Sequence, residues 1–260
     1  MSQVTVVTLQ KAKEKKDKIT CLTSYDATSA ALVDQAGVDV ILVGDSLGMV
    51  IQGESSTIPV TLEEMAYHTR CVAKGVSHAL VIADLPFGSY QTVTQALASS
   101  AILMKAGANM VKLEGAFVEV IEALVAQGIP VCGHLGLLPQ SVNRFGGYVV
   151  QGKGEEAGLV LKQANAVVEA GAQLLVLECI PSELAGTLTA QISIPTIGIG
   201  AGVDCDGQVL VLHDMLGMTL GRKARFVKDF LAESGSIGNA LAQFVSEVKN
   251  QQFPDKQHSY

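Results

Sequence analysis

A short phrase that recurs along this chain constrains its fold more than any other sequence feature. Each copy reads as a glycine, a few residues, three or four apolar residues and then a polar one; one copy, SHALVIAD, lacks the leading glycine. Most copies follow an amphipathic, alanine-rich stretch such as ATSAALVDQAG or EEAGLVLKQANAVVEAG. The chain thus alternates two kinds of segment, and the polar residues that end the phrases are Asp45, Asp84, Glu114, His134 and Glu178.

The two kinds of segment predict an alternation of helices and strands. The alanine-rich stretches end in glycine, which is typical of a helix C-terminus. The apolar runs are short, bounded by turns and rich in Val, Ile and Leu, which is typical of buried strands. A further helix is expected to begin at Thr61, where TLEE offers a capping box between Thr61 and Glu64. Such alternation predicts a parallel sheet with right-handed crossovers.

Eight such strands fit in the chain, in the segments KITCLTSYD, VDVILVGD, HALVIADLP, NMVKLEG, PVCGHLG, QLLVLECIP, PTIGIGAG and GQVLVLHDML. Eight strand–helix units in 260 residues favour a (β/α)8 TIM barrel, expected as a single domain over residues 1–260. A doubly wound open sheet is the alternative, but its glycine fingerprint belongs in the first strand–helix turn, and SYDATS has no glycine. The GxGxG of Gly198, Gly200 and Gly202 comes late and is interpreted as tight loop packing.

Two segments outside the repeated units carry predictions of their own. LLPQSVNRFGGYVVQGKG, after the fifth strand, is the longest irregular piece, and its glycines and proline are typical of a lid or binding loop. The tail at residues 251–260 follows the last expected helix, and we expect it to be frayed or used in assembly.

Composition and charge exclude several classes of function. The 25 acidic residues outnumber the 18 basic ones, for a net charge of −7, and no basic stripe stands out, so nucleic acid is not an expected partner. No apolar stretch reaches the length of about 18 residues that a membrane span needs, and the N-terminus has no signal-peptide core. The five cysteines include no CxxC pair, so we expect neither a disulfide framework nor a zinc site, and a cytoplasmic location.

The polar residues that end the strands are the candidate site, because the active site of a TIM barrel forms at the C-terminal ends of its strands. Asp45, Asp84 and Glu114 end neighbouring strands, and clustered carboxylates repel one another unless a cation or protons intervene. Their oxygens are hard ligands without a matching Cys/His set for zinc, which favours Mg²⁺. Taken singly, each acid could equally be a helix-capping or turn carboxylate.

Four further polar residues at these strand ends have both a functional and a structural interpretation. Lys112 lies two residues before Glu114 on one face of a strand, where it could bind an anionic substrate or form a buried ion pair. Glu178 ends an apolar strand and suits either a general base or a salt bridge. His134 could be a core imidazole or a catalytic group. Ser46 lacks the His–Asp spacing of a nucleophile, so we interpret it as a hydrogen-bond donor.

A metal ion, a lysine and a separate carboxylate base suit proton abstraction next to a ketone. A 2-oxo acid can chelate a metal through its keto and carboxylate oxygens, and the developing enolate is then stabilised electrostatically. The residues by themselves therefore predict a metal-dependent enzyme that acts on a 2-oxo acid through an enolate.

Seven motifs occur in order over residues 5 to 250: VGDSLGMVIQGESSTIPVTLEEMAYHTR, DLPFGSY, AGANMVKLEG, PVCGHLGLLPQSVNRFGGYVVQGKG, LLVLECIP, IGIGAG and DGQVLVLHDMLG. With them the chain resembles the ketopantoate hydroxymethyltransferase family. The resemblance implies a TIM barrel that transfers a one-carbon unit from 5,10-methylenetetrahydrofolate to 3-methyl-2-oxobutanoate with Mg²⁺. The product would be 2-dehydropantoate (ketopantoate), for pantothenate and coenzyme A. The resemblance also implies a cytoplasmic homo-oligomer, typically a decamer.

The resemblance further implies which residues bind the metal and the 2-oxo acid. Asp45 in VGDS and Asp84 in DLPF would hold the metal, and Glu114 in KLEG would belong to its shell, directly or through water. Ser46 and Lys112, together with the two aspartates, would contact the 2-oxo acid.

Glu178 in LECIP would be the base that removes the C3 proton, and His134 in GHLG would lie nearby as support. Two alternatives stay open. A Mg²⁺-dependent carbon–carbon lyase of the isocitrate-lyase kind would carry a catalytic cysteine in a Cys-Gly-His loop, whereas CGH at Cys132–His134 falls within an expected strand. A non-catalytic barrel scaffold would need no clustered acids.

Overall fold

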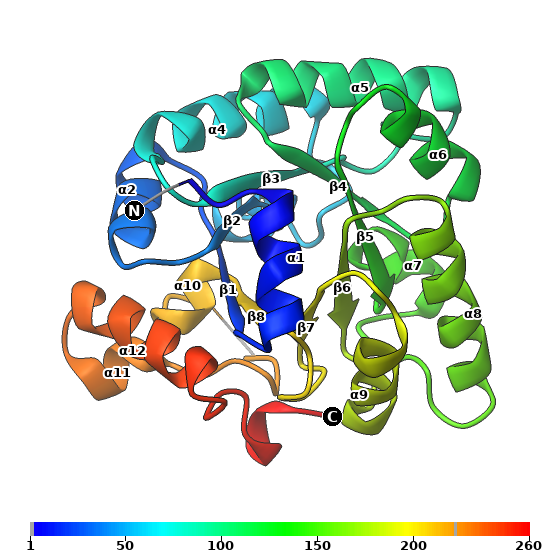
Figure 1. The fold of residues 1–260 in the computed structure, drawn as a ribbon. Helices are drawn as coiled ribbons and strands as arrows, with labels where there is room; N and C mark the ends of the chain where they lie inside the picture. The colour runs from blue at the N-terminus through cyan, green and yellow to red at the C-terminus, as the bar shows by residue number, and fades with distance from the viewer. Residues whose placement is uncertain (1–2, 221–222) are drawn as a thin grey trace.

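Eight parallel strands close into a barrel in the computed structural model, which describes residues 3–220 and 223–260 (Figure 1). The strands follow one another around the barrel in chain order, and β8 pairs with β1 to close it. They are β1 (Ile19–Thr23), β2 (Val40–Val43), β3 (Leu80–Asp84), β4 (Met110–Glu114), β5 (Val131–Gly136), β6 (Leu174–Glu178), β7 (Thr196–Ile199) and β8 (Gly207–Leu210). The predicted (β/α)8 TIM barrel is confirmed, with all eight of its expected strands.

Helices follow the strands and form the outer layer (Figure 1). The capping box expected at Thr61 and Glu64 begins α4, since the side chain of each residue accepts a hydrogen bond from the backbone of the other. Gly107 ends α5 with a left-handed φ of 113°, as expected of a C-terminal glycine. The helices of this layer are α2 (Ala27–Gln35), α4 (Leu62–Gly75), α5 (Val93–Ala106), α6 (Val118–Ala126), α8 (Glu156–Glu169), α9 (Ser182–Gln191) and the short α10 (Leu212–Met215).

The strands bury side chains on both faces. Outward-facing residues pack against the helices, and inward-facing ones fill the barrel with a separate apolar layer. Because side chains alternate along a strand, an inward series such as that of β4 begins with Met110 and continues with Lys112 and Glu114. The inner layer is therefore apolar below and polar at the carboxyl ends of the strands. Its apolar members include Ile19, Cys21, Val40, Leu42, Leu80, Ile82, Met110, Cys132, Leu174, Val176, Ile197 and Val209.

The amino-terminal end of the barrel is closed by α1 (Val6–Lys15), a helix that the sequence did not predict. In Figure 1 this helix, dark blue, crosses in front of the barrel. Leu9 is buried against the inner apolar layer, and Lys13 Nζ lies 2.7 Å from Asp206 Oδ2 in the loop before β8. These contacts leave the opposite, carboxyl-terminal end as the open end of the barrel, where a site can form.

The segment at residues 137–154, predicted to be a lid or binding loop, crosses that carboxyl-terminal end. It contains the single turns η1 (Pro139–Ser141) and α7 (Val142–Phe145). Its two ends are bonded to the end of β6, by Leu137 N donating to Glu178 O at 2.8 Å and Gln151 N donating to Cys179 O at 3.0 Å. The segment is thus placed over the strand ends; its opening stays a prediction.

The last ten residues pack against the barrel after α11 (Phe230–Ser234) and α12 (Ile237–Lys249). Phe253 is 2% exposed and lies against two aromatic rings, with centroids 5.4 Å from Phe230 and 6.0 Å from Phe244. Beyond η2 (Lys256–His258), the carbonyl of Tyr260 accepts hydrogen bonds from Ser182 N at 2.9 Å and Ser182 Oγ at 2.7 Å. The tail at 251–260 is therefore not frayed here, and its use in assembly stays a prediction.

Two further expectations concern helices and cysteines. Over the ranges that the structure describes, no helix is both long and apolar enough to cross a bilayer. All five cysteines carry free thiols, and Cys21 and Cys132 serve as small side chains of the inner layer.

Candidate active site

Five neighbouring strands, β2 to β6, bring all of the predicted site residues to the carboxyl-terminal end of the barrel. The parallel register aligns residues of adjacent strands: Asp84 with Lys112, and Glu114 with His134. The site residues Asp45, Asp84, Lys112, Glu114 and His134 are buried, whereas Ser46 and Glu178 are partly buried. The prediction that these side chains come together at one end of the barrel is confirmed.

Asp84 is paired with Lys112 across β3 and β4. Lys112 Nζ lies 2.6 Å from Asp84 Oδ1, with both side chains almost fully buried. This short contact between an ammonium and a carboxylate is a buried ion pair. Asp84 Oδ2 accepts a hydrogen bond from Asp45 N at 3.1 Å. One carboxylate thereby contacts both the lysine and the loop after β2.

Gly44 allows that close approach of the β2 loop to Asp84. A Cβ at Gly44 would lie 2.7 Å from Ser46 Oγ and 3.5 Å from Asp84 Oδ2. The first of these distances is shorter than real Cβ contacts allow, so a side chain here would displace Ser46. The glycine after the strand therefore lets Asp45 and Ser46 enter the site next to Asp84.

The acids outnumber the lysine, and this excess of negative charge shifts the pKa of buried groups. Burial raises the pKa of Asp45 well above its usual range, and the carboxylates of Asp84 and Glu114 raise it further. Burial lowers the pKa of Lys112, but the same group of carboxylates, Asp84 first, outweighs it and raises that pKa above its usual value. Lys112 is thus a fixed ammonium, and Asp45 is the acid whose charge most needs a further cation.

His134 lies between two carboxylates. Its Nδ1 is 3.6 Å from Glu114 Oε1, and its Nε2 is 3.1 Å from Glu178 Oε2. Burial and the nearby Lys112 lower the pKa of His134, but the two carboxylates outweigh them and raise it to about 9. Lys112 Nζ also lies 3.4 Å from His134 Nδ1, so the imidazole connects the lysine and Glu114 on one side with Glu178 on the other.

Ser46 is not arranged as a nucleophile. Its Oγ lies 2.8 Å from the hydroxyl of Tyr25, in a hydrogen bond whose donor can be either oxygen. Tyr25 is itself buried, and its carbonyl contacts His68 Nδ1 at 2.6 Å. The placement of Ser46 at the mouth of the site fits a hydrogen-bonding group.

Sequence reasoning missed Gln140, which lies in the predicted lid segment and contacts the acids directly. Its Nε2 donates to Asp45 Oδ2 at 2.8 Å and to the carbonyl of Leu85 at 3.0 Å, and its backbone N donates to Glu114 Oε2 at 3.0 Å. Tyr90 Oη donates to Gln140 Oε1 at 2.6 Å. The only sequence signal was a single amide after LLP, in a segment expected to cover the site.

The carboxylates offer a metal two close ligands rather than a complete cage. Among the described residues, no group of three or more His, Cys, Asp or Glu side chains converges to hold a metal ion. Asp45 and Asp84 adjoin each other, and Asp84 Oδ1 also contacts Lys112 Nζ, whereas Glu114 is turned towards Gln140 and His134. Two hard carboxylates fit Mg²⁺, which seldom uses an all-protein cage and takes water or substrate oxygens as its further ligands.

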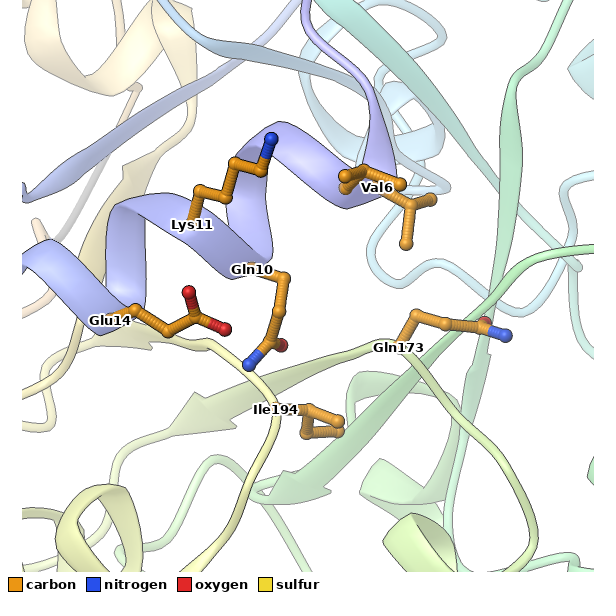
Figure 2. A pocket seen from close by; sticks show the side chains of 7 residues that line it. Val6, Gln10, Lys11, Glu14, Gln173 and Ile194 are labelled. Carbon is orange, nitrogen blue, oxygen red and sulfur yellow. The ribbon is translucent and has the colours of Figure 1, made fainter.

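A groove of about 340 Å³ lies at the opposite end of the barrel, against α1. Figure 2 shows side chains of α1 facing residues that precede β6 and β7. It is remote from the acids at the carboxyl ends of the strands, so it is not the candidate active site. Its lining residues are Val6, Val7, Gln10, Lys11, Glu14, Gln173 and Ile194.

Solved structures with the same fold include phosphonopyruvate hydrolase, at a TM-score of 0.64 and 15% identity over 84% of each chain. Another is 2,3-dimethylmalate lyase, a member of the PEP mutase/isocitrate lyase superfamily, at a TM-score of 0.63 and 16% identity over 95% of this chain and 96% of that one. At such low identity these likenesses show the fold alone.

Sequence comparison shows more than the fold. The family model described as ketopantoate hydroxymethyltransferase matches residues 3–256. A protein of Marinobacter nauticus named 3-methyl-2-oxobutanoate hydroxymethyltransferase is 56% identical over 99% of this chain and 98% of its own. A protein of the same name from Idiomarina loihiensis is 56% identical over 100% of this chain and 98% of its own. The chain therefore belongs to the ketopantoate hydroxymethyltransferase family of transferases.

Proposed function

We propose that this enzyme transfers a hydroxymethyl group from 5,10-methylenetetrahydrofolate to 3-methyl-2-oxobutanoate, through an enolate and with Mg²⁺, to give 2-dehydropantoate for pantothenate and coenzyme A. The observation that carries the proposal is the meeting of two adjacent aspartates, one buried lysine and one partly buried glutamate at the mouth of the barrel. The name shared by the relatives supports the 2-oxo acid as acceptor. The folate donor rests on the motif resemblance.

Binding of the 2-oxo acid falls to the residues on β2, β3 and β4. Asp45 and Asp84 would hold Mg²⁺, with Glu114 in its shell. When bound, the ion would act as a Lewis acid towards the keto oxygen and stabilise the charge that develops there. Lys112 adds an ammonium beside Asp84 that would attract the substrate carboxylate, leaving C3 on the far side of the keto carbon.

Proton removal falls to Glu178 on the other side of the mouth. Its side chain is 14% exposed, so it can reach a bound substrate while the remaining acids stay buried. His134 Nε2 lies 3.1 Å from Glu178 Oε2 and limits the rotation of that carboxylate. A carboxylate held in this way within reach of a bound substrate suits a general base.

The carbon–carbon lyase alternative finds no support in the position of its expected cysteine. Cys132 is fully buried within the inner layer of the barrel, on β5, and burial raises the pKa of its thiol to about 12. A thiol so placed is neither a thiolate nor near a substrate at the mouth. The Cys-Gly-His sequence here is therefore part of the strand core.

We also propose a cytoplasmic homo-oligomer, with a decamer as the form that the resemblance favours. Free thiols on all five cysteines suit a reducing compartment. Light scattering on the purified protein would give the subunit number.

Product formation tests the proposal most directly. The enzyme with Mg²⁺, 3-methyl-2-oxobutanoate and 5,10-methylenetetrahydrofolate is expected to yield 2-dehydropantoate, detected by mass spectrometry. 2-Oxobutanoate, which lacks one methyl branch, serves as a comparison acceptor. No product from any 2-oxo acid with this donor would overturn the assignment.

A further inference from the structure

Gln140 makes three polar contacts through its side chain, all at the candidate site. The residue is 6% exposed, so these bonds replace water that the amide would otherwise bind. We propose, on the basis of the metal-binding function proposed above, that Gln140 is a positioning residue. Its amide sets the orientation of the Asp45 carboxylate and thereby couples metal binding to closure of the segment at 137–154.

The hydrogen-bond partners of the Gln140 side-chain amide determine its orientation. The carbonyl of Leu85 can only accept, and the Asp45 carboxylate accepts, so both face the Nε2 donor. Tyr90 Oη, at 2.6 Å, then donates to Oε1. A reversed amide would set its oxygen against two acceptors. The Tyr90 hydroxyl therefore holds the donor end of Gln140 towards Asp45.

This orientation determines which oxygen of Asp45 is free. Gln140 Nε2 donates to Asp45 Oδ2 at 2.8 Å, and the backbone N of Asp45 donates to Asp84 Oδ2. With one carboxylate oxygen held on the side of the segment, Oδ1 is the oxygen left for a metal. Hydrogen bonds that orient a ligating carboxylate in this way contribute about 10–100-fold to metal affinity.

Gln140 also connects the covering segment to the acids. Gln140 lies within η1, near the start of the segment, and its backbone N donates to Glu114 Oε2 at 3.0 Å. The segment also contacts the barrel through backbone bonds near its two ends, at Leu137 and Gln151, and through the Tyr148 hydroxyl, which lies 3.6 Å from Met49 Sδ. The Gln140 side chain is thus a tie between the middle of the site and the chain that covers it.

Gln140→Met tests the proposal, because methionine keeps the length and volume of the side chain but has no donor. The Glu114 contact survives, since it uses the backbone. The matched control is Gln151→Met on the same segment, where the glutamine side chain bonds to the carbonyl of Val149 and not to the acids of the site. Tyr90→Phe, which removes only the hydroxyl that orients the amide, is the second variant should Gln140→Met fold poorly.

Two measurements follow each variant. Mn²⁺ titration by electron paramagnetic resonance should show affinity about 10–100-fold weaker for Gln140→Met and a smaller loss for Tyr90→Phe, with Gln151→Met unchanged and melting temperatures similar. Trypsin acting on metal-free protein should cut after the exposed Arg144 several-fold faster in Gln140→Met than in the control.

The outcomes separate this inference from the proposed function. Wild-type protein that binds no Mn²⁺, even with the 2-oxo acid present, would overturn the metal site itself. Wild-type binding with equal or tighter binding by Gln140→Met would overturn the positioning role alone, because tighter binding would mean that the amide competes with the ion. Unchanged trypsin cleavage would overturn the tie to the covering segment.

Discussion

Lys112 Nζ lies 2.6 Å from Asp84 Oδ1, and the two residues face each other in the register of β3 and β4. Only 5% of the lysine side chain and 3% of the aspartate side chain are exposed. Two charges so deeply buried depend on each other, because removal of one leaves the other without compensation.

Lys112→Met should destabilise the metal-free protein by about 3–5 kcal/mol, the usual cost of leaving one partner of a buried pair alone. The double variant Lys112→Met/Asp84→Asn should regain part of that loss. Urea unfolding of the wild type, both single variants and the double variant gives the coupling energy. Additive effects of the two substitutions would show that the ion pair contributes nothing to folding.

Glu178→Gln should slow exchange of the C3 proton strongly while leaving substrate binding largely intact. In D₂O with Mg²⁺ and 3-methyl-2-oxobutanoate, without folate, the wild type is expected to deuterate C3. The variant should be slower by about a hundred- to ten-thousand-fold, the contribution of a general base. Glu183→Gln, an exposed residue nearby on α9, is the control. Wild-type exchange that persists in Glu178→Gln would assign the base elsewhere.

The barrel could be predicted from sequence because each strand carries its own signal, a short apolar run that ends in a polar residue. The rule that barrel sites form at strand ends then gathered Asp84, Lys112 and Glu178 before any contact was known. By contrast, α1 gave little signal: of its ten residues only Leu9 is buried. That helix is stabilised by packing against the amino-terminal end of the barrel, and a local sequence pattern does not reveal such a contact.

Gln140 escaped prediction for a different reason. It lies in an irregular segment without periodicity, and its partners are distant in sequence: Asp45 is 95 residues away and Leu85 is 55. An amide also has no charge to attract notice. Residues that act by holding other side chains become visible only when the chain is folded.

His134 should make stability depend on pH in the metal-free protein. Its pKa in the folded state, about 9, lies above the value of about 6.5 expected in the unfolded chain, so the folded state binds the proton more tightly. The stabilisation is full below about pH 6.5 and is lost as pH rises through about 9. In the wild type the free energy of unfolding should fall by the order of 2–3 kcal/mol between these limits, and His134→Gln should lack this fall. Urea unfolding at pH 6.5 and 9.5 measures it, and parallel profiles for wild type and variant would contradict it.

Asp45→Asn should raise the folding stability of the metal-free protein and lower that of the metal-bound protein relative to wild type. Burial and the neighbouring carboxylates raise the pKa of Asp45, so its charge destabilises the metal-free fold as pH rises through that pKa. The variant should therefore be more stable than wild type at pH 8, by the order of 1 kcal/mol.

Saturating Mg²⁺ should reverse that order. The ion stabilises only a protein that binds it, by about 2.7 kcal/mol at a concentration one hundred times the dissociation constant. Thermal unfolding with and without Mg²⁺ measures both effects, and Asp17→Asn, at an exposed position, serves as control. An equal Mg²⁺ response in wild type and Asp45→Asn would remove this residue from the metal site.

Phe253→Ala tests whether the C-terminal tail belongs to the fold of its own chain. Phe253 is 2% exposed, within 6.0 Å of the rings of both Phe230 and Phe244, so its truncation leaves a cavity in a packed aromatic cluster. Such changes cost about 3–5 kcal/mol. Tyr67→Ala, at a side chain that is 58% exposed, should change stability by less than about 0.5 kcal/mol. If urea unfolding shows the same loss of stability in both variants, the tail does not pack on its own barrel in solution. Its contacts would then be expected on a neighbouring subunit.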